Sequence, residues 1–106
     1  MSMIERLEAL LAEGNDSSQL RYGLASACFS EQRFADAHRH AGIAVKLDPD
    51  YSAAWRLLGR ASEKIGDMAA ARDAYRNGIA VAESRGDKQL VREMTVFMNR
   101  LQRDAD

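Results

Sequence analysis

Apolar and small residues recur along this chain at the spacing that lines one face of a helix. Two runs between positions 51 and 83 show it most clearly: Trp55, Leu58, Gly59 and Ser62, and then Ala71, Tyr75, Gly78 and Ile79. Within each run, large residues alternate with small ones, so two helices could approach closely along a single seam. Gly66 and Asp67 separate the runs and supply a helix stop and a turn. The stretch is therefore predicted to form a helical hairpin.

The N-terminal half shows the same periodicity with its own start and stop signals. Ser2 and Glu5 match a capping box, which predicts a helix from about Met3 to the left-handed stop at Gly14. Asp16 is expected to cap a second helix that ends near Glu31. The apolar faces are expected to carry Ile4, Leu7 and Leu11 in the first helix, and Leu20, Leu24, Ala27 and Cys28 in the second.

Two further helices complete a prediction of six helices and no strand. The third ends at Asp48-Pro49, because proline disfavours a helical residue before it. Gly86 and Asp87 are expected to stop the fifth helix and cap the last one, from Lys88 to about Arg103. The residues expected to face inward are Phe34, Ala37, Ala41, Ala44, Val45 and Leu47 in the third helix, and Leu90, Met94, Phe97 and Leu101 in the last helix.

The chain also repeats itself when it is shifted by 34 residues. The residues that then coincide include Ser18 with Ser52, Leu24 with Leu58, Ala27 with Ala61, and Ala37 with Ala71. Two helices in a period of about 34 residues are typical of tetratricopeptide repeats. The stretch 52–85 resembles that family through Trp55, Leu58, Gly59, Gly66, Ala71 and Tyr75, and the stretch 18–51 through Leu24, Ala25, Phe34, Ala37, Ala44 and Pro49.

This resemblance implies an all-α fold in which antiparallel helical hairpins stack as a short right-handed superhelix. The expected organisation of the single domain 1–106 is an N-terminal capping helix (1–14), two repeats (18–51 and 52–85) and a C-terminal capping helix (87–103). The whole chain resembles the small single-domain tetratricopeptide proteins of bacteria. Stacked units need such caps, because each exposes an apolar side.

The first repeat departs from the family pattern and is predicted to be the less stable one. Arg21 stands where the family has tryptophan, and Gln32 replaces the glycine of the hairpin. Gly23 and Gly42 lie inside helices, where each costs about 1 kcal/mol relative to alanine.

Composition narrows the classes of partner and compartment. The chain has 106 residues with 15 basic and 16 acidic side chains, a net charge of -1. That balance provides no overall field to attract nucleic acid. No apolar run approaches membrane-spanning length, and the single cysteine, Cys28, gives no sign of an oxidising compartment. A cytoplasmic protein without a cofactor is expected.

No catalytic or metal-binding constellation emerges from the sequence. His38 and His40 are two apart, so on a helix they point in nearly opposite directions and cannot share one metal ion without a third partner nearby. A solvated outer face is the favoured interpretation of both histidines. Cys28 lies on a buried stripe and is interpreted as a packed, inert thiol. The chain is therefore not expected to be an enzyme.

A binding surface is the stronger hypothesis. The resemblance implies that the first helix of each pair lines the concave side of the stack. The residues expected there are Gln19, Tyr22, Ser26 and Phe29, and Ala53, Arg56, Arg60, Glu63 and Lys64. Two aromatic residues beside two guanidinium groups would suit a peptide that carries a carboxylate. This is not the carboxylate clamp of the chaperone-binding relatives, because Tyr22 and Ser26 occupy positions where that clamp has Lys and Asn.

Two functions therefore remain open. The leading one is a non-enzymatic protein-interaction module that holds a peptide segment of a partner protein on its concave face. The alternative is a structural protein that associates with itself. Val91, Val96 and Met98 lie beside the inward stripe of the last helix, and surplus apolar surface there could form an interface between two copies.

Overall fold

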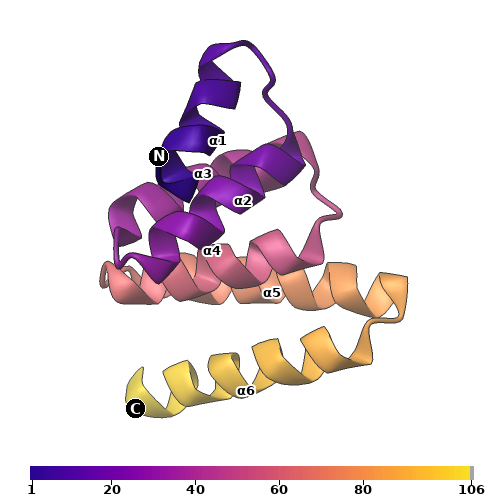
Figure 1. Ribbon diagram of the computed structural model, residues 1–106. Coiled ribbons are helices and arrows are strands. Elements are labelled where there is room, and N and C mark those ends of the chain that lie inside the picture. Colours follow the sequence, from indigo (N-terminus) through magenta and orange to yellow (C-terminus); the bar gives the residue numbers. More distant parts are fainter. Residues whose placement is uncertain (106) are drawn as a thin grey trace.

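A computed structural model describes residues 1–105 of the chain, and this part contains six helices and no strand. The helices are α1 (Met3–Ala12), α2 (Ser18–Ser30), α3 (Phe34–Leu47), α4 (Ser52–Lys64), α5 (Met68–Arg85) and α6 (Lys88–Ala105), shown in Figure 1. The all-α fold predicted from the helical periodicity is confirmed.

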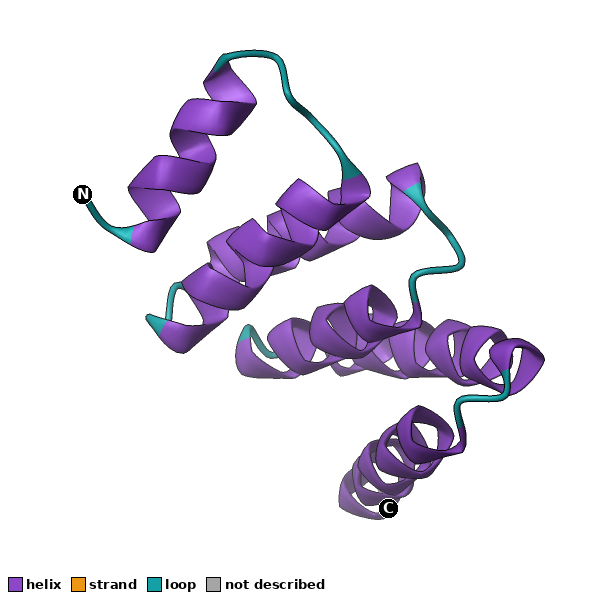
Figure 2. Ribbon diagram, turned by 45° about the vertical axis from the view of Figure 1, so that its right-hand side comes forward, coloured by secondary structure: helices purple, strands orange, loops and turns teal. Residues whose placement is uncertain are grey.

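The helices are stacked along the long dimension of a molecule that measures 44 × 28 × 19 Å. The pairs α2–α3 and α4–α5 are antiparallel hairpins, and α3 packs against α4. The helices α2, α4 and α6 form one row, because α4 contacts both α2 and α6. The helices α3 and α5 lie behind this row, and α1 covers α2 at the N-terminal end (Figures 1 and 2).

The two hairpins turn in the same way at equivalent positions. In the first, the amide of Arg33 donates to the Cys28 carbonyl at 2.8 Å, and in the second, the amide of Asp67 donates to the Ser62 carbonyl at 2.9 Å. The residue before each donor has a positive φ, 61° at Gln32 and 85° at Gly66. Only glycine adopts this left-handed conformation without steric cost. The backbone of the first hairpin is therefore strained at Gln32, whereas the second hairpin has glycine at the equivalent position and is not strained there.

Replacing Gln32 with glycine is expected to raise the free energy of unfolding by about 1 kcal/mol, because the steric cost of the left-handed conformation is removed. Urea unfolding followed by circular dichroism measures the change. Gly66→Ala, at the equivalent turn, is the matched control and is expected to lower stability by a similar amount. A destabilised Gln32→Gly variant would contradict the assignment of strain to this residue.

Most helix boundaries follow the predicted signals. Ser2 and Glu5 form the capping box of α1, and Gly14 and Gly86 adopt positive φ just past the ends of α1 and α5. The carboxylate of Asp87 accepts from the amide of Leu90 at the start of α6.

The predicted cap of α2 is wrong. Ser17, not Asp16, precedes the first helical residue, and its hydroxyl accepts from the amide of Leu20 at 3.1 Å. Asp16 lies one residue too early to reach that amide. Its carboxylate instead binds both ends of the Arg21 guanidinium, at 2.8 and 3.0 Å.

The core runs along the stack as a chain of small apolar clusters. Leu24 and Cys28 pack with Ile4 and Ala37 near the N-terminal end, and Tyr75 and Met94 pack with Leu101 near the other. One predicted core residue is misplaced: Leu47, in the last turn of α3, is 52% exposed.

Helix α6 shows less free apolar surface than its sequence suggests. Val91 and Met98 pack against the core between α5 and α6, so Val96, 62% exposed, is the outward member of the three. Within residues 1–105, no helix combines the length and the apolar character that crossing a membrane requires.

Candidate functional site

The face to which the resemblance assigns binding is formed by α2, α4 and α6, and we call it the inner face. We define it by these side chains: Gln19, Tyr22, Ser26 and Phe29 of α2; Ala53, Arg56, Arg60, Glu63 and Lys64 of α4; and Leu90, Glu93, Phe97 and Arg100 of α6. The first two sets are the residues predicted from the sequence.

Aromatic side chains join α2 to α4 on this face. The ring of Phe29 lies 4.9 Å from the guanidinium carbon of Arg60, and it also meets the ring of Phe34 edge-on at 5.1 Å. The ring of Tyr22 lies 5.0 Å from that of Tyr51, the residue before α4. The predicted aromatic and cationic stripes are thus brought together at Phe29 and Arg60.

The side chains of α4 and α6 meet in a regular series. Arg56 forms an ion pair with Glu93 at 2.6 Å, and Glu63 forms one with Arg100. Between these pairs, Arg60 lies 6.0 Å from the centre of the Phe97 ring. The partners are spaced i, i+4 and i+7 on both helices, which places them on one stripe of each helix. The two helices therefore run parallel, side by side.

Glu93 and Arg100 were not among the residues predicted for this site, and Phe97 was predicted only as a core residue. The signal was present, because positions 56, 60 and 63 repeat at 93, 97 and 100 with complementary charges at both ends. It becomes visible only when α6 is placed beside α4.

These contacts change the charge that the inner face presents. Arg56, expected to be available to a carboxylate, already binds the carboxylate of Glu93. Arg60 makes no ion pair with any of residues 1–105 and lies over an aromatic ring instead. Lys64 does the same, with its ammonium 5.5 Å from the centre of the Phe34 ring. The unpaired positive charge is therefore at the C-terminal end of α4.

The carboxylate of Glu63 is held by a side chain of α5 as well as by one of α6. The hydroxyl of Tyr75, a fully buried residue of α5, donates a hydrogen bond to its carboxylate. Burial raises the pKa of Tyr75, and the bond to Glu63 raises it further. The hydroxyl thus stays protonated as a donor, and Glu63 keeps a fixed position on the inner face.

A cavity lies at each end of the seam between α4 and α6. One, of about 360 Å³, is lined by Arg60, Glu63, Lys64, Met68, Phe97 and Arg100. The other, of about 440 Å³, is lined by Gln19, Asp48, Asp50, Tyr51, Ser52, Ala53, Arg85, Asp87 and Leu90. The first is predominantly basic and the second predominantly acidic, so the inner face is electrically polarised along its helices.

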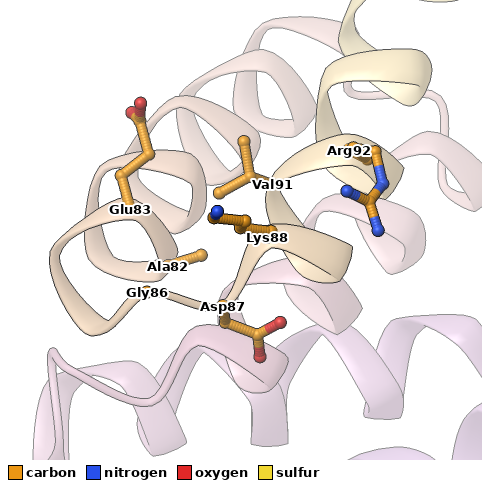
Figure 3. A pocket seen from close by; sticks show the side chains of 7 residues that line it. All are labelled: Ala82, Glu83, Gly86, Asp87, Lys88, Val91 and Arg92. Atoms are coloured by element: carbon orange, nitrogen blue, oxygen red, sulfur yellow. The ribbon is translucent and has the colours of Figure 1, made fainter.

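A third cavity, of about 410 Å³, lies outside the inner face where α5 turns into α6 (Figure 3). The side chains of Glu83, Asp87 and Arg92 line it but point in different directions. They do not converge on a common point, so this cavity lacks the arrangement that a reacting centre needs.

The interpretation of His40 as a solvated residue is wrong. His40 is only 3% exposed, and its Nδ1 accepts a hydrogen bond from Arg21 at 3.1 Å. Arg21 is held in turn by Asp16. Arg21, which stands where the family has tryptophan, thus links the start of α2 to α3 through a polar contact. Burial lowers the pKa of His40, and the positive charges of Arg39 and Arg21 lower it further.

This burial predicts a loss of stability in acid. Unfolded histidine takes up a proton near pH 6.5, whereas folded His40 resists protonation until a lower pH. Its contribution is therefore complete above about pH 6.5 and declines as the pH falls below that value. Urea unfolding at about pH 7.5 and about pH 5 should show a larger loss for the wild-type protein than for His40→Gln. Equal losses would contradict the prediction.

The remaining chemical candidates are the thiol of Cys28 and the side chains that could hold a metal ion. Cys28 is buried, and burial raises the pKa of its thiol, which disfavours the nucleophilic thiolate. In the part of the chain that the structure describes, no three His, Cys, Asp or Glu side chains are grouped so as to hold a metal ion.

Comparison of the sequence with known families and proteins agrees with this fold. A family model described as tetratricopeptide repeat matches residues 29–86. The chain is 46% identical over 101 residues to the TPR repeat-containing protein PA0015 of Pseudomonas aeruginosa, covering 95% of this chain and 96% of that protein. It is also 36% identical over 66 residues to the heat shock protein sti1 homolog of Schizosaccharomyces pombe, covering 61% of this chain but only 11% of that protein.

Solved structures show the same arrangement of helices. The solution structure of protein BPP2914 from Bordetella parapertussis matches with a TM-score of 0.83 and 43% identity, covering 98% of this chain and 90% of that one. The crystal structure of MamA matches with a TM-score of 0.68 at 22% identity, over 94% of this chain and 65% of that one, and this likeness concerns the fold alone. The 34-residue period, the stacked hairpins and these matches together show that the chain belongs to the tetratricopeptide repeat family.

Proposed function

We propose that this protein is a non-enzymatic interaction module that binds a segment of a partner protein on its inner face. The tetratricopeptide repeat family suggests a protein–protein interaction module, and such proteins are generally scaffolds rather than enzymes. The finer part of the proposal, the face and the kind of ligand, depends on the side chains of α2, α4 and α6.

The observation that supports this face most directly is the state of Arg60. Arg60 is partly exposed, its guanidinium lies 4.9 Å from the Phe29 ring and 6.0 Å from the Phe97 ring, and it has no carboxylate partner among residues 1–105. An arginine held over aromatic rings keeps its hydrogen-bond donors available at low conformational cost. Elsewhere on the inner face, Ser26 and, near its acidic end, Gln19 are exposed and offer further polar contacts. Such a surface suits the backbone and side chains of a peptide segment.

A site-specific cross-linking experiment tests the face. A photoreactive phenylalanine is introduced at Ser26, an exposed inner-face position of α2, or at Asn77, an exposed position of α5 outside that face. Each full-length variant is irradiated in lysate of the source cell. The Ser26 variant is expected to form a discrete cross-linked product with a partner protein, and the Asn77 variant is not.

The fold of the two variants is the control for this experiment. Circular dichroism of the two variants should match that of the wild-type protein, since neither position is in the core. Adding Arg60→Ala to the Ser26 variant is expected to weaken its cross-linked product. Cross-links that form from Asn77 but not from Ser26 would place the partner elsewhere and remove the inner face from the proposal.

A further inference from the structure

The basic cavity at the C-terminal end of α4 has a composition that selects a particular kind of ligand. We propose that it is the anchoring subsite for an acidic segment of the partner protein and receives the carboxylates of aspartate or glutamate side chains. We call it the anchor cavity; its lining is Arg60, Glu63, Lys64, Met68, Phe97 and Arg100. This inference rests on the proposed function, and it adds the chemistry of the ligand and its position.

The charge balance of the anchor cavity is the first argument. Three cationic side chains line it against the single carboxylate of Glu63. That carboxylate is already bound by Arg100 and by the Tyr75 hydroxyl. Arg60 and Lys64 make no ion pair within the described part of the chain, so the cavity keeps an excess of positive charge. A ligand that brings carboxylates would balance it.

The placement of these two cations is the second argument. Arg60 and Lys64 are four residues apart on α4, so their β-carbons lie about 5–6 Å from each other on one face of the helix. Each is held over a ring, Arg60 over Phe29 and Lys64 over Phe34. Long cationic side chains normally lose conformational freedom when they bind, and stacking reduces that cost in advance. Two nearby acidic side chains of one segment could therefore be bound together.

The cavity also has an apolar part. Phe97 lines it from α6, and Met68, 40% exposed, lines it from the start of α5. Methionine side chains adapt to ligands of varied shape. The expected segment therefore carries an apolar residue next to its acidic ones.

The opposite end of the inner face determines where an acidic segment can bind. Among residues 1–105, the charged ones that line the cavity at this end are Asp48, Asp50 and Asp87, with Arg85 as the one cation. Carboxylates of a ligand would be repelled there and attracted at the anchor cavity. Arg60 lies seven positions after Ala53 on α4, about 10 Å along the helix. The acidic residues of the segment are thus confined to one end of the face.

Selection from a random peptide library tests this inference. The library is displayed with the C-terminus of each peptide fused to the carrier, so that no free C-terminal carboxylate is available. It is selected on the full-length protein, and retained peptides are synthesised with amidated C-termini. Dissociation constants are measured by fluorescence polarisation for three proteins: the wild type, the double variant with Arg60→Ala and Lys64→Ala, and the single variant Arg76→Ala. Arg76, exposed on α5 and paired with Asp73, is the matched control.

Retained peptides are expected to be enriched in aspartate and glutamate relative to the unselected library. The double substitution should weaken their binding at least tenfold, as should changing their acidic residues to the corresponding amides, whereas Arg76→Ala should leave binding unchanged. If acidic peptides bind the doubly substituted protein with an unchanged dissociation constant, the inference is overturned. A preference for peptides with a free C-terminal carboxylate, shown with unblocked versions, would also overturn it in favour of a terminal anchor.

The same experiment separates this inference from the proposed function. Ser26→Trp is used to block the inner face at α2. If it abolishes the binding of retained peptides that have no acidic residues, the acidic anchor is overturned and the inner face remains the binding site. Retained peptides that are insensitive to every inner-face variant, or a library from which none is retained, would count against both.

Discussion

Gly59→Ala is expected to lower the free energy of unfolding by about 2–3 kcal/mol, although alanine is normally the better helix former. A β-carbon at position 59 would lie 2.6 Å from Cδ1 and 2.7 Å from Cζ of Tyr75. The ring cannot move aside easily, because Tyr75 is fully buried, lies 5.6 Å from the ring of Phe97 and is tied through its hydroxyl to Glu63. The substitution therefore forces α4 and α5 apart.

Gly42→Ala is the matched control for this prediction. Gly42 also lies inside a helix, α3, but a β-carbon there would have, apart from its chain neighbours and the nearby backbone of α3, no heavy atom within 4 Å. Stability should rise by about 1 kcal/mol, because alanine loses less backbone entropy than glycine in a helix. Urea unfolding of both variants compares them directly. Equal effects of the two substitutions would show that the packing of Tyr75 does not require glycine at position 59.

Met94→Ala is expected to cost about 2–5 kcal/mol, the range for truncating a large buried side chain. Met94 is fully buried in the cluster that joins α6 to α5, and its sulfur would lie 2.5 Å from a β-carbon placed on Gly78. Helix α6 is at the end of the stack, and among the six described helices it contacts only α4 and α5. The loss should therefore appear first as opening of α6 rather than as unfolding of the whole protein.

Hydrogen exchange measured by mass spectrometry checks this. Amides of α6 should exchange faster in Met94→Ala while those of α2 and α3 keep their protection. Val96→Ala is the control on the same helix: Val96 is 62% exposed, and the change should stay within about 0.5 kcal/mol. Faster exchange throughout the chain would mean that α6 does not open separately. Because Glu93, Phe97 and Arg100 belong to α6, its opening should also weaken binding at the inner face.

The backbone of this protein was largely predictable because its signals are local. The capping box of Ser2 and Glu5, the left-handed Gly14 and Gly86, and the turn at Gly66 all act within a few residues of the helix end that they define. The 34-residue period then identified the family, since equivalent turns recur at equivalent positions.

Two of the errors concern polar side chains that hydrogen-bond to partners other than those expected. Asp16 was expected to cap α2 but pairs with Arg21, and Arg21 in turn reaches His40 on α3. His40, which was expected to face solvent, is buried. Helical periodicity marks one face as apolar, but it cannot show that a polar residue will be buried by a hydrogen bond from another helix.

For the candidate site, the sequence alone determined which side chains of α2 and α4 share a stripe, because that depends only on helical spacing. Only the tertiary structure decided which charges on the stripe of α4 remain unpaired. Arg56 is neutralised by Glu93, 37 residues further along the chain, and Arg60 is not. That difference depends on how α6 packs beside α4, and long-range packing reflects the fit of whole helix surfaces rather than a pattern within either helix.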